Sequence, residues 1–240
     1  MACRSGSDAG GRGDARRRQP DRVASDERMD VTRLLEAASL LVPEAVATGN
    51  DITVGDVWDL LVRDEWDIAL SLLEELGEGE GGGEGEGDRR PLPPAFWESL
   101  AGAAEQLYME RSAAWCHWRV YETRHGVIRA DLTLRPAAES RRTTPVPGAG
   151  VLRPVWDIGH RSPTGGPAVN VARLWVEGRP ALEPGGRSLV RLAPLDPSQW
   201  RHLAPGRRIT MHEGRDAVGT ATVVEVRRPP VAVREGSEGP

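Results

Sequence analysis

The stretch Val-Ile-Arg-Ala-Asp-Leu-Thr-Leu at positions 127–134 decides the fold class of this chain of 240 residues. Apolar and polar side chains alternate along it, and a period of two is typical of a strand with one buried face. Pro-Gly and Gly-Gly pairs mark turns further along the chain. Five more segments predict strands: 151–157, 168–176, 187–194, 206–212 and 217–226. We expect the six strands to close into an antiparallel β-barrel, because closure removes exposed sheet edges.

Four motifs follow one another in this region. They read Arg141-Arg142-Thr143-Thr144-Pro145, Arg153-Pro154-Val155-Trp156-Asp157, Glu183-Pro184-Gly185-Gly186, and the run from Ile209 to Val224. In that order and spacing, residues 126–226 resemble the C-terminal β-barrel, the third domain, of elongation factor Tu. That family also has a GTPase domain whose phosphate loop needs a lysine, and this chain contains none. The resemblance therefore implies the barrel without the GTPase domain and without a nucleotide.

In elongation factor Tu, the third domain helps to hold the T-stem of aminoacyl-tRNA through phosphate and ribose contacts. The resemblance implies contact with RNA or another partner at six residues: Arg141, Arg142, Thr143, Glu213, Gly214 and Arg215. Guanidinium and hydroxyl groups suit backbone phosphates, and such contacts position a nucleic acid without recognising its sequence. The chain departs from the family where Arg215 directly follows Gly214, in place of a second glycine. The alternative is that these are ordinary loop residues of a barrel with another role.

The remaining chain divides by composition and periodicity. Asp30 and Thr53 are suited to begin helices, and Gly77 is suited to end a third helix that starts near Asp64. We expect Met29 to be the initiator, with Met1 as the alternative. The predicted segments are a disordered extension 1–28, an acidic helical bundle 29–77, a Gly/Glu/Pro linker 78–94, a long helix 95–125, the β-barrel 126–228 and a disordered tail 229–240. The predicted fold class is α+β, with helices and barrel segregated along the chain.

Charge divides along the same boundaries. Residues 29–90 carry four arginines against sixteen carboxylates, whereas residues 124–240 carry eighteen arginines against eleven carboxylates. The bundle region is therefore strongly acidic and the barrel region basic. Each surface could simply be solvated, the bundle could cover the barrel, or the barrel could face an anionic partner.

Catalytic and metal-binding patterns find little support. Cys116 and His117 are adjacent in a predicted helix, so their side chains point about 100° apart and cannot act as nucleophile and base. Cys116 has only Cys3 as a second cysteine, which is too few for a disulfide framework or a zinc site. The histidines at 160, 202 and 212 lack metal-ligand spacing. We therefore expect no enzymatic activity, no cofactor and no metal.

These observations favour a binding protein. No run of about eighteen apolar residues occurs, so we expect no membrane partner and a cytoplasmic location. The principal hypothesis is that the barrel contacts tRNA, other structured RNA or the translation machinery. The alternative is a protein-binding regulator or a toxin-neutralising immunity protein that uses the acidic helical face.

Overall fold

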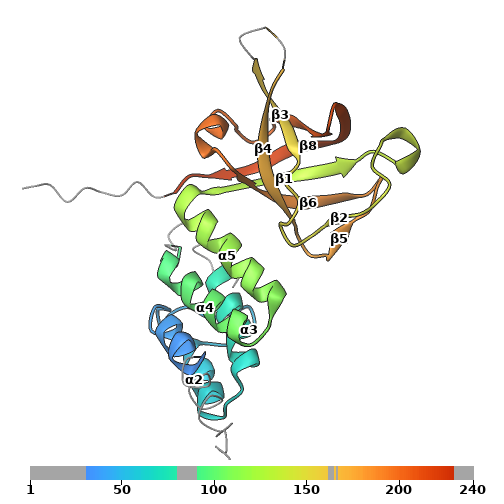
Figure 1. Cartoon of the computed structure of the whole chain (residues 1–240). Helices are drawn as coiled ribbons and strands as arrows, with labels where there is room; N and C mark the ends of the chain where they lie inside the picture. Colours follow the sequence, from blue (N-terminus) through green and yellow to red (C-terminus); the bar gives the residue numbers. More distant parts are fainter. Residues whose placement is uncertain (1–30, 80–90, 162–164, 166, 230–240) are drawn as a thin grey trace, which may run out of the picture.

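The structure is a computed structural model that describes residues 31–79, 91–161, 165 and 167–229. Figure 1 shows a helical unit followed in the chain by a β-barrel, which confirms the segregated α+β class. The predicted disordered extension, most of the predicted linker and nearly all of the predicted tail lie outside the described residues. The described helices are a helix over 31–39, α2 (Val54–Val62), α3 (Trp66–Glu78), α4 (Pro94–Gln106) and α5 (Glu110–His125).

The helical unit is held by one apolar core to which every helix contributes. Leu35, Leu70, Leu73 and Leu100 are fully buried within it. Thr53 begins α2 as expected, because the Asp56 carboxylate accepts hydrogen bonds from the backbone N–H of Thr53 at 2.8 Å and from its hydroxyl at 3.0 Å. None of the helices in the described part of the chain is long and apolar enough to cross a membrane.

The prediction of a single long helix over 95–125 is wrong, because the helix is interrupted after Gln106 and the segment forms two helices, α4 and α5. Tyr108 adopts a left-handed backbone conformation with φ of 57° and is 90% exposed. The break lets α4 and α5 pack against each other, so that Trp97 and Cys116 are buried in the same core. A continuous helix would carry these two side chains far apart and leave the tryptophan in water.

Gly77 was expected to end the third helix, and this prediction is also wrong. It lies inside α3, which ends at Glu78 with the left-handed Gly79 at its C-cap. A Cβ on Gly77 would come within 2.6 Å of the Phe96 ring and 2.7 Å of the Trp97 ring. Gly77 is therefore a packing position that brings α3 close to α4.

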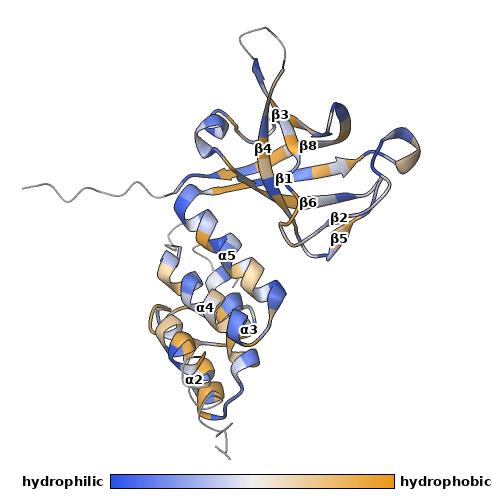
Figure 2. Cartoon of the chain, viewed as in Figure 1, coloured by the Kyte–Doolittle hydropathy of each residue, from blue (hydrophilic) through white to orange (hydrophobic). Residues whose placement is uncertain are grey.

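Six strands form a closed antiparallel barrel, as the sequence predicted, and their order around it is β1-β6-β4-β3-β7-β8. Its interior is filled by the inward side chains of all six strands, with Trp156, Leu132 and Met211 fully buried. The strands are β1 (Val127–Leu134), β3 (Val155–Arg161), β4 (Pro167–Val176), β6 (Arg187–Pro194), β7 (Arg208–Glu213) and β8 (Asp216–Arg227). Two further short strands, β2 (Val146–Pro147) and β5 (Ala181–Leu182), pair separately. Figure 2 shows hydrophobic and hydrophilic stretches alternating along the barrel strands.

One strand is displaced along the chain from its predicted bounds. The segment predicted over 151–157 enters the sheet only at Val155 and continues to Arg161. Pro154 immediately precedes this strand, and a proline has no N–H to donate to a strand ladder. The other five strands agree with the predicted bounds to within about two residues, the uncertainty usual for such boundaries.

Helix α5 docks on the outside of the barrel. Trp118 of α5 is buried against Trp175 of β4 and Ala193 of β6. The Tyr121 hydroxyl donates a hydrogen bond of 2.6 Å to the backbone oxygen of Pro194. The acidic helical unit is thus joined to the barrel by a packed interface at one side (Figure 1).

Candidate functional site

Two loops that are distant in the sequence meet at one end of the barrel. Leu134 at the end of β1 pairs with Gly219 near the start of β8, so the segment 135–145 after β1 leaves the barrel beside the β7–β8 turn. Glu213 pairs with Asp216 and closes that turn. The Arg142 guanidinium forms an ion pair with the Glu213 carboxylate and also donates to the Pro145 carbonyl at 3.2 Å. We call the segments 135–145 and 213–216 the loop pair.

The structure brings the six sequence-predicted residues together and separates them into two roles. The Arg142 side chain is only 9% exposed, and its charge is held by Glu213. Arg141, Thr143 and Arg215 are exposed, and within the described ranges none of their side chains forms a hydrogen bond or an ion pair. Gly214 supplies the left-handed turn with φ of 63°. Arg142 and Glu213 therefore position the loops, whereas three donor side chains remain free.

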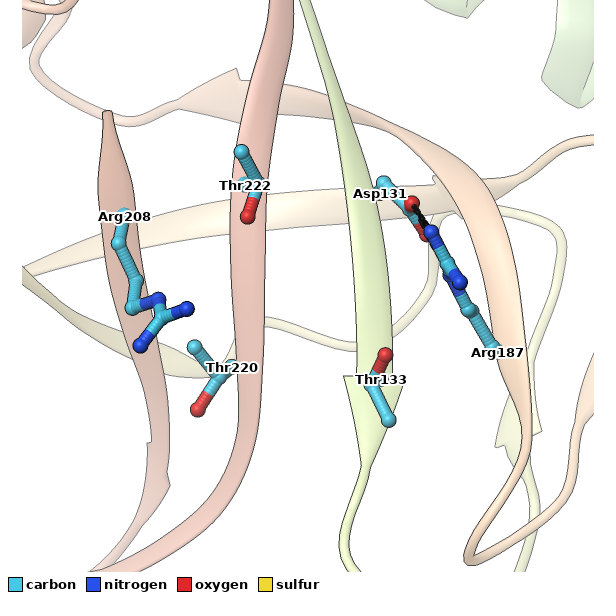
Figure 3. A pocket seen from close by; sticks show the side chains of 6 residues that line it. All are labelled: Asp131, Thr133, Arg187, Arg208, Thr220 and Thr222. Carbon is cyan, nitrogen blue, oxygen red and sulfur yellow. Dashed lines mark hydrogen bonds and ion pairs between the residues drawn. The ribbon is translucent and has the colours of Figure 1, made fainter. Parts of the chain in front are cut away.

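A polar depression of about 280 Å³ lies on the outer face of the barrel strands that lead to the loop pair. Figure 3 shows the six side chains that line it: Asp131, Thr133, Arg187, Arg208, Thr220 and Thr222. Strand register places Thr133 opposite both Arg187 and Thr220, and Arg208 opposite Thr222. Sequence reasoning missed this strand-face depression. The only signal was the polar half of the period-two pattern in β1 and β8, which strands with a solvated face also show.

Arg187 and Asp131 form a paired group at one side of the strand-face depression. The Arg187 Nε donates to Asp131 Oδ1 at 2.9 Å, and the two side chains form an ion pair. This hydrogen bonding, together with the positive charge of Arg187, lowers the pKa of Asp131 below its usual value. The carboxylate therefore stays ionised and its charge is balanced by Arg187.

A second charged group ties α5 to the barrel. Glu122 of α5 is buried, and its carboxylate accepts hydrogen bonds from Trp118 Nε1 at 2.9 Å, from Arg119 at 2.6 Å and from Arg191 of β6 at 2.9 Å. Arg191 also donates to Glu177 at 2.9 Å. Burial lowers the pKa of the Arg119 guanidinium, and the charge of Glu122 opposes that shift. These contacts are internal, so this ion-pair network holds the two units together.

Glu177 continues the network along the barrel to Arg129 and Glu225. Arg129 of β1 donates to Glu177 at 2.7 and 2.8 Å and to Glu225 at 3.1 Å. Burial would raise the pKa of Glu177, but hydrogen bonds and charges from Arg129 and Arg191 lower it below its usual value. These charged side chains satisfy one another, so this network does not offer free donors to a ligand as the loop pair and the strand-face depression do.

Cys116 is a structural residue of the helical core. Its side chain is buried, and its thiol donates a hydrogen bond to Glu74 at 3.4 Å. Burial, reinforced by the charge of Glu74, raises the pKa of the Cys116 thiol far above its usual value, so a reactive thiolate does not form. The neighbouring His117 contacts Glu105 at 2.8 Å. The geometry offers no nucleophile–base pair at this position.

Two of the three histidines discussed above come together in the fold. The His160 and His202 rings stack with centroids 4.1 Å apart. Both His202 ring nitrogens face backbone oxygens, those of Gln199 at 3.1 Å and Ile158 at 2.9 Å, so they are occupied. Among the described residues, no three His, Cys, Asp or Glu side chains are grouped so that they could hold a metal ion.

The fold and the loop pair define a closed six-stranded antiparallel β-barrel with a helical unit docked on its side. No protein-family model matches the chain, and no similar protein was found among curated proteins. The surfaces from which function can be inferred are the loop pair, the strand-face depression and the exposed face of the helical unit.

Proposed function

We propose that this protein binds structured RNA through the loop pair of its barrel. Arg141, Thr143 and Arg215 would donate to phosphate and ribose oxygens, and the bases would not be recognised. The proposal extends the resemblance of residues 126–226 to the third domain of elongation factor Tu, in which the corresponding segments contact tRNA. Transfer RNA or another structured RNA of the translation machinery is accordingly the proposed ligand class.

The single observation that supports this proposal is the ion pair between Arg142 and Glu213. The two residues are 71 positions apart and belong to the two motifs that the sequence assigned to one contact surface. Their ion pair brings the two motifs into contact in the fold. It also uses one arginine for positioning and leaves Arg141 and Arg215 exposed for a ligand.

The location of the loop pair also suits a large anionic ligand. Strand β1 starts directly after α5 and ends at Leu134 beside the loop pair. Eight strand residues span roughly 25 Å, so the end of β1 at the loop pair lies well away from the end of the acidic helical unit. The basic excess of the barrel region would attract the phosphate backbone from a distance.

The test is RNA binding by the full chain and by the double variant Arg141→Ala with Arg215→Ala, measured by fluorescence anisotropy with a labelled tRNA. We expect the wild-type affinity to fall steeply with salt and the variant to bind at least about tenfold more weakly. The matched control is Arg201→Ala with Arg228→Ala, which removes the same charge away from the loop pair. Equal losses in both double variants would show a nonspecific charge effect and refute the site.

A second candidate function is supported by one observation on the helical unit. Val62 at the end of α2 is 85% exposed and Ile68 in α3 is 47% exposed. Both lie among the carboxylates of Asp59, Asp64 and Asp67, so the surface combines apolar and acidic character. A basic protein would complement it, as expected for a regulator or a toxin-neutralising immunity protein.

A pull-down before and after ribonuclease treatment separates the two candidates. An association that survives ribonuclease and is lost in Val62→Asp would support the protein partner. An association that disappears with ribonuclease and is unaffected by Val62→Asp would support RNA binding by the barrel instead.

A further inference from the structure

The strand-face depression contains donors that the fold itself does not use. Within the described part of the chain, the side chains of Thr133, Thr220, Thr222 and Arg208 form no hydrogen bond or ion pair with another residue. They come from three adjacent strands, and their positions are fixed by the antiparallel register. Figure 3 shows the Arg208 guanidinium extending toward Thr220. The depression is therefore a group of unpaired donors on strands whose backbone register is fixed.

The lining favours an anionic ligand over other classes. The Asp131 carboxylate is engaged by Arg187, so it offers little repulsion and little free acceptor capacity. Arg208 adds an uncompensated positive charge and planar donors suited to a phosphate. No aromatic ring lines the depression, so stacking of a base is not provided. These features fit a tetrahedral oxyanion better than a base, an apolar group or a cation.

The strand-face depression also lies in line with the loop pair. Strand β7 runs from Arg208 to Glu213, and β8 returns from Asp216 past Thr220 and Thr222. Five steps along β7 correspond to roughly 17 Å. One RNA strand of several nucleotides would cover that distance, so a single ligand could contact both surfaces.

We propose that the strand-face depression is a phosphate subsite, in which Arg208 and the hydroxyls of Thr133, Thr220 and Thr222 bind a backbone phosphate of the RNA that contacts the loop pair. This inference rests on the proposed function and extends its footprint from the barrel end onto the strand face. It assigns the strand face to phosphate binding, with Arg208 as the principal charged contact. Arg187 remains paired with Asp131 and borders the subsite.

The experiment uses the full chain, a labelled tRNA and the triple variant Arg208→Ala, Thr220→Val, Thr222→Val. Valine keeps the shape and strand preference of threonine but removes the hydroxyl donor. We expect the RNA affinity to fall at least about tenfold and the salt dependence to weaken by about one phosphate contact. Thr210→Val is the matched control, because Thr210 is opposite Thr220 but does not line the depression, and it should bind as the wild type does.

The outcomes distinguish this inference from the function on which it rests. If the triple variant binds normally while the loop variant Arg141→Ala with Arg215→Ala binds weakly, the subsite is refuted and the proposed function stands. If both variants bind RNA like the wild type, both proposals fail. Inorganic phosphate is titrated separately, with chemical shifts of the threonine amides as the readout. Saturable binding of phosphate that excess RNA does not displace would assign the depression to free phosphate and overturn the backbone subsite.

Discussion

Replacing Glu122 with glutamine should destabilise the protein strongly, because this carboxylate is the buried centre of the contact between α5 and the barrel. The Glu122 side chain is 2% exposed, and it faces Arg119 and Arg191, whose side chains are 13% and 12% exposed. Glutamine keeps the shape but removes the negative charge. The poorly solvated Arg119 guanidinium would then lose its paired carboxylate, and Arg191 beside it would keep only Glu177.

The size of the expected stability loss follows from the burial of the Glu122 carboxylate. Removing one member of a buried ion pair costs about 3 to 5 kcal/mol, because the remaining charge is left uncompensated. For a chain of this size, that free energy lowers the melting temperature by roughly 6 to 20 °C. The ring of Trp118 is at the same contact, and its Nε1 would lose a charged acceptor as well.

Asp131→Asn is the matched control, since it also exchanges a carboxylate for an amide in an ion pair with arginine. Its partner Arg187 is 71% exposed, so water replaces the lost contact. An exposed pair contributes about 0 to 1 kcal/mol. Denaturant unfolding followed by tryptophan fluorescence measures both variants. A loss below about 1 kcal/mol for Glu122→Gln, or equal losses for the two variants, would refute the argument that burial makes Glu122 important.

Three further substitutions test the helical core. Burial raises the pKa of Glu74 above its usual value, so the contribution of this group to stability is fully present at low pH and is lost as pH rises through the raised pKa. Glu74→Gln should remove that loss and be the more stable form at neutral pH, and the stability difference between the two proteins should grow with pH in thermal unfolding between about pH 4 and pH 8. Gly77→Ala should cost about 1 to 3 kcal/mol because its methyl group would overlap the Trp97 ring. Gly102→Ala meets only the Leu34 side chain at 3.3 Å and should be neutral or stabilising by up to about 1 kcal/mol in chemical denaturation. Equal effects of the two alanines would contradict this account of Gly77.

The barrel could be predicted because its signals are local. Alternation along β1 and β8, together with Pro-Gly and Gly-Gly turns, determines which residues face inward without knowledge of the partner strands. The helix break at Tyr108 could not be found in this way. The apolar pattern continues through Leu107, and the left-handed turn is accompanied by the packing of α4 against α5, which no local signal shows. Gly77 was misassigned for a related reason, since a glycine near a helix end suits either a cap or a close approach.

In the candidate site, too, the features with a local sequence signal could be predicted and those that depend on tertiary contacts could not. The exposed arginines of the loop pair could be found from the resemblance, but the pairing of Arg142 with Glu213 depends on a contact between distant segments. The strand-face depression was missed because Thr133, Thr220 and Thr222 are also ordinary residues of a solvated strand face. The docking of α5 through Glu122 likewise required tertiary structure, because nothing local distinguishes this glutamate from the many exposed carboxylates nearby.

The most direct test of RNA binding by the loop pair is the slope of the logarithm of the association constant against the logarithm of salt concentration, for labelled tRNA and the full chain. Each phosphate contact contributes slightly less than one unit to that slope. Arg141→Ala with Arg215→Ala should therefore flatten the slope by about two units, whereas Arg201→Ala with Arg228→Ala should leave it unchanged. A slope near zero for the wild type, or the same slope for both double variants, would contradict the assignment of RNA binding to the loop pair.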